Sequence, residues 1–490
     1  MIYTLSYSNP DKHYIDIQVQ ISTITTSHVE VQLPAWRPGR YEMANFAKNM
    51  TLLKAYGTTG EKLNVQKLTK DCWRIQTETY TSVQLNYSYY AQQMDAGGSW
   101  LDDKQLYVNF VNCLVHVKGR MQEECRIQLQ LPENYKIACG LPEISKHVLI
   151  ASDYYQLVDS PMIASATLQK YSYQIQSTTF YIWVQGECHL NWEKVKLDFI
   201  KFSEVQMQMM QGFPCEAYHF LFHWLPFQHY HGVEHQNSTV ITLGPASQAE
   251  QLYGEMLGIS SHELFHTWNV IRIRPAELLP YDFSKENYFS TGFVAEGITT
   301  YYGDLFLARA GIFYIEEYLQ ELSQTLNKHF KFSNRSSLSL IDSSFDLWLD
   351  GYTMGAPGRK VSIYNKGALA ALILDLEIRQ LTQNTRSLDD VMRELWKQFG
   401  DMNAGYTIQD YQQIIEKVAG QNYQDYFDEC IFGTIPLQDR TSRALNYVGC
   451  ELAILQALPD SENIEITIRL KETITETEKE NLQKWLENAR

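Results

Sequence analysis

The chain has 490 residues, of which 44% are hydrophobic and 20% are charged. This composition is typical of a folded globular protein, and the length predicts two or three domains rather than a single core. The net charge of −16 argues against a nucleic-acid-binding protein, which usually carries a basic surface. The sequence has neither an apolar run long enough for a transmembrane helix nor a basic cluster that would favour a membrane as partner.

The N-terminus and the cysteines indicate the cellular compartment in which the protein is expected. The first ten residues lack the basic stretch and apolar core of a signal peptide. The eight cysteines are scattered along the chain and form no C-x-x-C pair. Both observations favour reduced thiols in a cytoplasmic protein.

The first part of the chain, residues 1–170, is expected to form an N-terminal β domain. Hydrophobic and polar residues alternate at 14–21, 29–33 and 125–131, and turn residues lie between these runs. A period of two is typical of strands with one buried face. The pattern therefore predicts an antiparallel sandwich or saddle.

The second part, residues 171–440, begins with three expected strands at 180–184, 218–224 and 231–243. From about residue 250 the hydrophobic pattern becomes helical. Ser387 and Thr407 each precede an amphipathic run and are expected to cap a helix. Residues 441–490 are expected to form a short C-terminal α/β segment. The predicted fold class is α+β and multidomain, with a mostly helical second half.

One short motif carries the strongest chemical signal. Residues 262–266 read His-Glu-Leu-Phe-His. Because four residues make about one helical turn, His262 and His266 are expected on one face of a helix. Two imidazoles on one face can hold Zn(II), and Glu263 can act as general base on water at the metal. The alternative is an ordinary helix with two hydrogen-bonded histidines.

An acid within an apolar run downstream is the candidate third ligand. Glu296 lies within the apolar run 293–298. Burial of a lone carboxylate is costly unless it is paired or binds a metal, and catalytic zinc sites commonly use three protein ligands. The alternative is an exposed acid at a helix start. Thr300 and Asp304, one and two helical turns later, are candidates for orienting a ligand histidine.

Further signals admit both a chemical and a structural interpretation. Glu234 can bind a substrate's α-ammonium group by a charge-assisted hydrogen bond, or it can be a surface residue of a strand. Tyr364 can donate to an oxyanion, or it can be a core aromatic residue at a helix start. Arg272 and Arg274, directly after the histidine motif, can pair with site carboxylates or be structural.

A second possible metal cluster consists of histidines in and beside the expected strands. Their spacing is much less specific than that of the histidine motif. Its members are His223, His229, His231 and His235.

Five segments together resemble the glycyl aminopeptidase family of thermolysin-like zinc peptidases (gluzincins), whose members often carry a PDZ domain. The resemblance spans about residues 1–440, and the motifs follow the order of that family. The segments are L-P-A-W-R-P-G-R-Y at 33–41, G-V-E-H-Q-N-S-T at 232–239, H-E-L-F-H-T-W-N-V-I-R-I-R-P at 262–275, A-E-G-I-T-T-Y-Y at 295–302 and Y-F-D-E-C-I-F-G-T-I-P-L at 426–437.

The resemblance implies a zinc aminopeptidase with a thermolysin-like catalytic domain at 171–440. One Zn(II) per chain would be held by His262, His266 and Glu296, with Glu263 as general base. The substrate would be a peptide with a free N-terminus, and by analogy alone its first residue would be small, such as Gly or Ala.

The resemblance also assigns the two remaining candidates. Tyr364 matches the transition-state tyrosine of the Y-x-K-G motif in related aminopeptidases. Glu234 matches the amine-anchoring glutamate of their G-A-M-E-N motif, of which only the glycine and the glutamate are present here. Residues 441–490 look too short for a complete PDZ domain, so that module is expected to be missing or a remnant.

Two other functions remain open. A zinc endopeptidase of the same fold would share the metal ligands but would not need Glu234. A peptide-binding protein with a purely structural zinc would leave Glu263 without a role, and structural zinc sites are usually closed by four ligands rich in cysteine. The oligomeric state is also left open.

Overall fold

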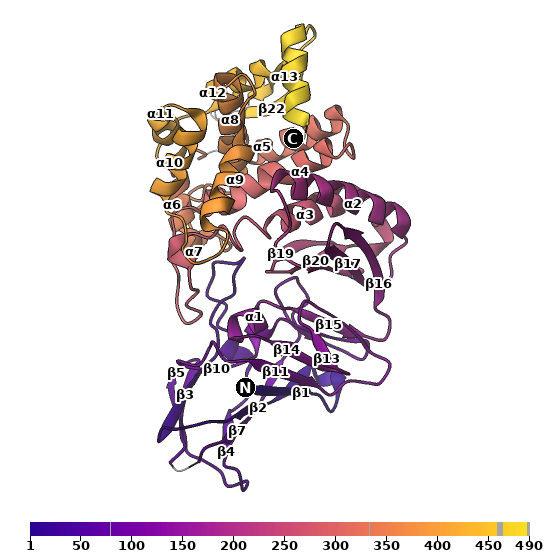
Figure 1. Ribbon diagram of the computed structural model, residues 1–490, viewed down its shortest axis with the longest axis vertical. Coiled ribbons are helices and arrows are strands. Elements are labelled where there is room, and N and C mark those ends of the chain that lie inside the picture. Colours follow the sequence, from indigo (N-terminus) through magenta and orange to yellow (C-terminus); the bar gives the residue numbers. More distant parts are fainter. Residues whose placement is uncertain (79, 333, 458–463, 488–490) are drawn as a thin grey trace. The chain divides into compact units, whose positions relative to one another are not determined.

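The computed structural model describes residues 1–78, 80–332, 334–457 and 464–487 (Figure 1). The chain divides into two compact units, each built from several segments. The first unit contains Met1–Leu190, Cys215–Leu252 and Asp282–Glu286, and the second contains Asn191–Pro214, Tyr253–Tyr281 and Asn287–Arg490.

The largest sheet of the first unit has seven strands in the order β13-β14-β11-β1-β2-β7-β4. Strands β1 and β11 are parallel, and the other neighbours are antiparallel. Buried and exposed side chains alternate along β2, as its sequence predicts. The bounds are β1 (Ile2–Ser6), β2 (Tyr14–Ile21), β4 (Lys54–Tyr56), β7 (Val83–Tyr90), β11 (Cys125–Leu129), β13 (Glu143–Ser145) and β14 (Val148–Ala151).

Two four-stranded antiparallel sheets and a short helix, α1 (Tyr154–Val158), complete the N-terminal part. One sheet has the order β10-β3-β6-β5 and the other β12-β15-β9-β8. The expected N-terminal antiparallel β domain is therefore confirmed. The bounds are β3 (His28–Gln32), β5 (Val65–Thr69), β6 (Cys72–Gln76), β8 (Trp100–Leu101), β9 (Gln105–Val108), β10 (His116–Val117), β12 (Lys136–Cys139) and β15 (Met162–Ser165).

A mixed five-stranded sheet follows in the order β16-β17-β18-β20-β19. Strands β17, β18 and β20 are parallel, and an antiparallel strand lies at each edge. The expected strands at 180–184 and 218–224 lie within β17 and β18. The bounds are β16 (Gln169–Ile175), β17 (Thr178–Gln185), β18 (Ala217–Trp224), β19 (His229–Glu234) and β20 (Ser238–Gly244).

The expectation of a single strand at 231–243 is wrong, because a turn divides this stretch into β19 and β20. The backbone N–H of His235 donates to the carbonyl oxygen of Ser238 at 2.9 Å. Asp159 fixes the turn from outside, since its carboxylate accepts from the backbone of Gln236 at 2.9 Å and lies 2.9 Å from the His235 ring. A side chain distant in the sequence therefore helps to hold this turn.

The core of the first unit joins the five-stranded sheet to the N-terminal sheets. Side chains from β9, β12 and β15 pack with side chains from β17 to β20 in one hydrophobic cluster. Its fully or largely buried members are Ala96, Tyr107, Ala138, Ile163, Leu168, Trp183, Leu221, Val233 and Val240. This packing explains why the five-stranded sheet and the N-terminal sheets form one compact unit. The domain boundaries expected from the sequence, at residues 170 and 440, stay a prediction.

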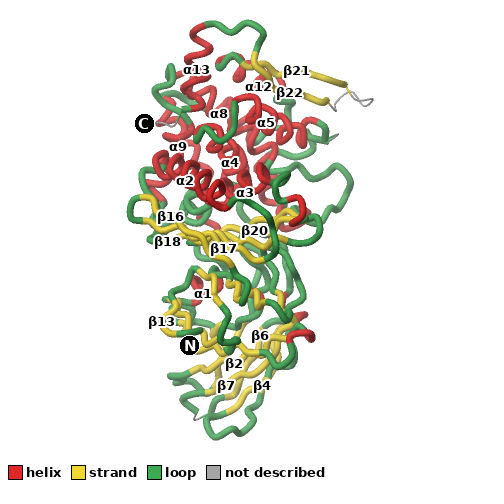
Figure 2. Tube along the Cα trace, turned by 90° about the vertical axis from the view of Figure 1, so that its right-hand side faces the viewer, coloured by secondary structure: helices red, strands yellow, loops and turns green. Residues whose placement is uncertain are grey.

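The second unit is mainly helical, as expected (red in Figure 2). Both expected caps are confirmed: Ser387 and Thr407 each form a capping box at the start of a helix. No helix of the described residues has the length and apolarity needed to cross a membrane. The bounds are α2 (Trp192–Met209), α3 (Tyr253–Phe265), α4 (Ile298–Arg309), α5 (Ile315–Phe330), α6 (Leu340–Phe345), α7 (Leu347–Asp350), α8 (Asn365–Leu381), α9 (Leu388–Phe399), α10 (Ile408–Ala419), α11 (Gln424–Tyr426), α12 (Gln438–Tyr447) and α13 (Glu476–Leu486).

The C-terminal residues are part of this helical unit. Strands β21 (Cys450–Ala457) and β22 (Ile464–Leu470) form a two-stranded antiparallel sheet. Asn327 of α5 bonds both backbone groups of Ile466, donating to its oxygen at 2.8 Å and accepting from its nitrogen at 2.9 Å. Helix α5 thereby covers the outer edge of β22, whose backbone groups would otherwise bond to water.

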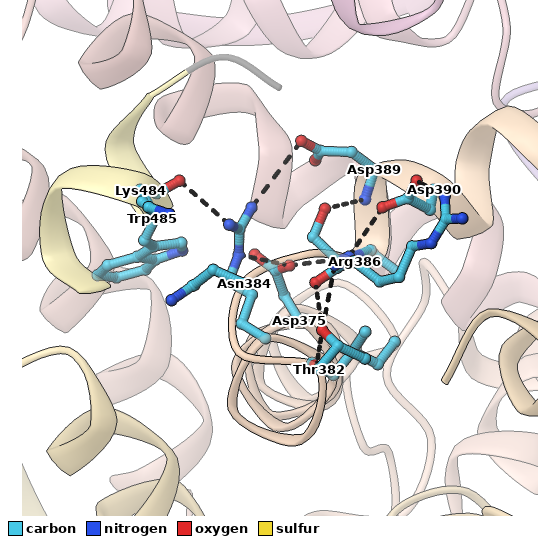
Figure 3. A network of polar contacts seen from close by, with 12 residues as sticks. Asp375, Thr382, Asn384, Arg386, Asp389, Asp390, Lys484 and Trp485 are labelled. Carbon is cyan, nitrogen blue, oxygen red and sulfur yellow. Dashed lines mark hydrogen bonds and ion pairs between the residues drawn. The ribbon is translucent and has the colours of Figure 1, made fainter. Parts of the chain in front are cut away.

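The last helix, α13, is held by a buried polar network (Figure 3). Trp485 is fully buried, and its Nε1 donates to the hydroxyl of Tyr301 on α4 at 2.8 Å. Arg379 of α8 donates to the backbone oxygen of Lys484 at 3.1 Å and to Asp375 at 3.0 Å. Helix α13 therefore closes the core around α4 and α8.

Candidate metal centre

Helix α3 brings the two histidines of the motif together. His262 lies in its last turn, and His266 follows the helix, with its backbone N–H donating to the oxygen of His262 at 3.3 Å. The two Nε2 atoms are 3.0 Å apart, and the rings meet edge to face at 84°. Both imidazoles therefore project from one face of the helix, as their spacing predicts.

Glu296 reaches the same place from a different element. It lies in a π-helical turn, Phe293–Gly297, which leads directly into α4. Its side chain is only 4% exposed, and Oε2 lies 3.5 Å from Nε2 of His266 and 4.0 Å from Nε2 of His262. An exposed acid at a helix start does not fit this burial. Single π-helical turns are frequent at functional sites because they change the direction of a side chain within a helix.

The hydrogen bonds of the two rings point their lone pairs at each other. Nδ1 of His266 lies 2.7 Å from the backbone oxygen of Asn269. The backbone of Thr299 hydrogen-bonds the His262 ring in the same manner. A carbonyl oxygen only accepts, so each ring carries its proton on that side and presents a lone pair on Nε2. Burial, and then the neighbouring His266, hold the pKa of His262 well below its ordinary value, which keeps the ring neutral.

These donor atoms fit a metal ion. The ligand atoms of His262, His266 and Glu296 all lie within 4.8 Å of one another. Two lone pairs and a carboxylate oxygen facing one another repel unless a cation lies between them. Two imidazole nitrogens and one carboxylate oxygen form a donor set that Zn(II) accepts in catalytic sites.

A buried amide connects the histidines to the turn that carries Glu296. The side chain of Asn269 donates to the backbone oxygens of Val294 at 2.8 Å and Ala295 at 3.2 Å, and it lies 3.0 Å from the hydroxyl of Thr299. Sequence reasoning missed Asn269. The available signal was an amide three residues after the second histidine, where a chain leaving the helix needs a polar partner.

Thr300 and Asp304, the two residues expected to orient a histidine, both lie on α4, and their role stays a prediction. The backbone of Thr299, next to Thr300, fills that role for His262. Asp304 lies against Gly258 of α3, where a Cβ would come within 3.0 Å of its carboxylate. Burial raises the pKa of Asp304 to about 7.

Helices α3 and α4 approach each other closely beside His262. A Cβ added to Gly303 would lie 3.3 Å from Cβ of His262. Ser261, the residue before His262, donates to the oxygen of Gly303 at 2.7 Å. Glu263, the next residue of α3, is 5% exposed. The general-base candidate is therefore a buried carboxylate that directly follows two residues packed on α4.

Tyr364 stands at the start of α8 and is partly exposed. The first turn of α8 packs directly on the turn that carries Glu296, since a Cβ on Gly297 would lie 2.5 Å from Cα of Gly367. Only glycine at both positions allows this contact. Tyr364 precedes Gly367 by one helical turn. Its backbone is therefore held against the segment that carries Glu296 by this contact.

Glu234 belongs to the first unit. It is the last residue of β19 and is 5% exposed. Its neighbour Val233 points into the hydrophobic cluster of that unit, and alternation along the strand turns Glu234 to the opposite face. A surface position, which was the alternative interpretation, does not agree with this burial.

The four other histidines do not form a metal cluster among the described residues. Nε2 of His223 lies 2.9 Å from the amide oxygen of Gln105. Nδ1 of His235 lies 2.9 Å from Asp159. These partners explain the burial of both rings without a metal.

The two arginines after the motif make contacts that shape the local chain. Arg272 donates to the backbone oxygen of Thr267 at 2.7 Å. Arg274 donates to the oxygen of Ile271 at 2.8 Å and lies over the ring of Tyr281 at 4.3 Å. Both contacts fold the segment after His266 back on itself, which favours the structural interpretation.

Two family profiles match the chain. The M61 peptidase N-terminal domain matches residues 2–166, and the M61 glycyl aminopeptidase domain matches residues 255–370. A comparison with curated proteins gave no match.

Solved structures show the same architecture. An aminopeptidase N family protein from Idiomarina loihiensis is 26% identical, with a TM-score of 0.88 over 94% of this chain and 81% of that chain. An M1 zinc metallopeptidase from Deinococcus radiodurans, solved as a Glu-to-Ala variant with a Tyr-Ser-Ala substrate, is 12% identical, with a TM-score of 0.56 over 89% and 94%. A two-domain M1 zinc metallopeptidase bound to L-arginine is 13% identical, with a TM-score of 0.54 over the same shares. The last two likenesses concern the fold alone.

The fold, the family profiles and the histidine–glutamate cluster together define a metalloaminopeptidase. Both profiles describe one family, and together they cover more than half of the chain in the order expected from its motifs. The chain belongs to the M61 glycyl aminopeptidase family.

Proposed function

We propose that this protein is a zinc aminopeptidase that removes the first residue from peptides with a free N-terminus. One Zn(II) per chain is held by His262, His266 and Glu296. The observation that carries this proposal is the convergence of two Nε2 lone pairs and the Glu296 carboxylate, with both histidine protons directed to backbone oxygens. When bound, zinc polarises a peptide carbonyl and lowers the pKa of water.

Glu263 is the general base of the proposed reaction. It takes a proton from the attacking water and passes it to the leaving amine. Its position next to His262 on α3 and its burial beside the proposed metal ligands support this role.

Tyr364 stabilises the oxyanion that develops on the attacked carbonyl, by donating its hydroxyl proton in a hydrogen bond. The close packing of Gly297 on Gly367 supports this role, since it fixes the start of α8 against the segment of Glu296.

Glu234 binds the ammonium group of the substrate and so limits cleavage to the first peptide bond. The support is a buried carboxylate at the end of β19, in a family named for an aminopeptidase activity. A buried carboxylate gains a strong, charge-assisted partner when an ammonium group binds.

We further propose that the preferred first residue is small, such as Gly or Ala. This preference follows from the family description and from no contact in the structure. The relatives in the same fold were solved with Tyr-Ser-Ala and with L-arginine, so the fold also accommodates larger residues. The eight cysteines are thiols rather than disulfides, which supports the expectation of a cytoplasmic enzyme.

The test is hydrolysis of Gly- and Ala-initiated peptides beside their N-acetylated forms, with a chelator control. We expect chelator-sensitive cleavage of the free-amine peptides alone. Cleavage of both sets would indicate an endopeptidase of the same fold. Absence of cleavage in a zinc-loaded preparation, across a panel of first residues, would favour a peptide-binding protein.

A further inference from the structure

A tight turn in the first unit lies directly against Glu234. The turn is Arg37-Pro38-Gly39-Arg40, and the backbone N–H of Arg40 donates to the oxygen of Arg37 at 3.3 Å. Gly39 has a φ of +75°. Proline at the second and glycine at the third position are typical of a type II turn, which requires a positive φ at its third residue.

The contact between Gly39 and Glu234 leaves no room for a side chain. A Cβ on Gly39 would lie 2.6 Å from Oε2 and 3.1 Å from Oε1 of Glu234. The carboxylate therefore packs on the bare Cα of the glycine. A methyl group at this point would either displace the carboxylate or occupy space beside its oxygens.

The residues on either side of the turn are anchored in the first unit. Trp36 and Tyr41, which flank it, are fully buried. Nε1 of Trp36 donates to the backbone oxygen of Asp282 at 2.8 Å, and the backbone N–H of Ala35 donates to the oxygen of Phe283 at 2.8 Å. These bonds fix the place of Gly39 before any substrate binds.

A second contact joins the turn to β19. The buried side chain of Arg37 packs on Gly97, beside Asp95. His231 of β19 lies 4.0 Å from the same Asp95. Burial, and then the charge of Arg37, lower the pKa of His231 to about 4. The turn therefore contacts β19 at Glu234, and its Arg37 shares the neighbour Asp95 with His231 of the same strand.

We propose that Gly39 is a positioning residue for the amine anchor Glu234. Its backbone fixes the direction of the carboxylate, and its missing side chain keeps open the space that the substrate's ammonium group takes. The proposal rests on the amine-binding role of Glu234 proposed above. It assigns a function to the L-P-A-W-R-P-G-R-Y segment of the N-terminal part, which is otherwise distant in sequence from the proposed chemistry.

The test compares Gly39→Ala with a matched control, Gly119→Ala. Gly119 has a φ of +78° and occupies the same place in a turn, where Arg120 donates to Val117 at 3.0 Å. A Cβ on Gly119 would meet nothing within 4 Å. Both variants bear the same backbone cost, so only the contact with Glu234 differs. We expect Gly39→Ala to raise KM for free-amine peptides about tenfold or more with a smaller change in kcat, and Gly119→Ala to stay within about twofold.

A double-mutant cycle shows whether Gly39 acts through Glu234. Once Glu234→Gln has weakened the anchor, Gly39→Ala should add little further loss. An equal loss from Gly39→Ala in both backgrounds would overturn the proposal. A silent Glu234→Gln would instead overturn the amine anchor itself. A third outcome is possible, in which Glu234→Gln raises KM strongly but Gly39→Ala changes KM no more than Gly119→Ala does. That result would overturn only the role of Gly39.

If Gly39→Ala does not fold, Pro38→Ala tests the positioning role of the turn instead. This variant adds no atoms near Glu234 but loosens the turn, at a cost of the size seen for proline replacements. We expect KM for free-amine peptides to rise about two- to fivefold, and to rise by less when Glu234→Gln is present. An unchanged KM in a folded Pro38→Ala protein would overturn the proposal.

Discussion

Asn269 accepts the Nδ1 proton of His266 through its backbone oxygen at 2.7 Å, and its side-chain amide holds the turn that carries Glu296. The residue is fully buried. One residue therefore fixes both the ring of one proposed ligand and the backbone of another. The backbone contact survives any substitution, whereas the amide contact can be removed by mutation.

Asn269→Ala should weaken zinc binding. The variant loses the amide bonds to Val294 and Ala295, so the turn that carries Glu296 is less well fixed before the metal binds. Loss of a residue that orients metal ligands typically weakens metal affinity about 10- to 100-fold. Competition with a chromophoric chelator measures the affinity directly, without reference to activity.

Asn384→Ala is the matched control for that prediction. Its amide lies in the same helical unit and donates to Tyr447 and Asn481, each at 2.7 Å (Asn384 is labelled in Figure 3). It should lower stability and leave zinc affinity unchanged. If both variants lost affinity to the same degree, general loosening of the helical unit would explain the effect, and the specific role of Asn269 would be wrong.

Glu263→Gln should separate chemistry from metal binding. Glutamine keeps the shape of the side chain but cannot take a proton, so kcat should fall about 10²- to 10⁴-fold while zinc content stays at one per chain. Both quantities are measured on one preparation. A kcat within about tenfold of the parent enzyme would remove Glu263 from the reaction, and it would favour the peptide-binding interpretation.

Trp485→Ala should destabilise the helical unit by about 3–5 kcal/mol, because it leaves a large cavity in a closed core. Trp485→Phe keeps most of the packing and loses the hydrogen bond to Tyr301, so it should cost only about 1 kcal/mol. Urea unfolding followed by circular dichroism compares the two. Parent-like stability of Trp485→Ala would mean that α13 does not contribute to this core.

Local patterns explain how much of the fold could be predicted. The caps at Ser387 and Thr407 and the shared face of His262 and His266 depend on residues a few positions apart, so the sequence alone indicates them. The turn between β19 and β20 is held in part by Asp159, which is distant in the sequence. Alternation cannot show such a partner, and this is why the stretch was expected to be one strand.

The same distinction applies to the candidate site. Glu296 could be proposed because a carboxylate in an apolar run needs a partner, but nothing local predicts the π-helical turn that directs it. The roles of Asn269 and Gly39 depend on contacts with segments far along the chain. The residues with the plainest chemistry were therefore predictable, whereas those that position them were not.

Stability should fall in mild acid because buried histidines stay neutral in the folded protein. His223 is 1% exposed and bonded to Gln105, and burial lowers its pKa to about 3. Burial also lowers the pKa of His219 and of His329 to about 3. Between pH 6.5 and about 3 the unfolded chain takes up protons at these positions and the folded protein does not, so their contribution is complete above pH 6.5 and is lost as the pH falls.

His223→Gln tests this pH dependence. At pH 5 a single such histidine should lower the free energy of unfolding by about 2 kcal/mol relative to pH 7. Glutamine retains a partner for Gln105 and does not titrate, so its cost should be the same at both pH values and the loss in acid should be smaller by about that amount. Urea unfolding at pH 5 and pH 7 compares the variant with the parent, and an identical acid loss in His223→Gln and the parent would show that His223 is not a source of the acid sensitivity.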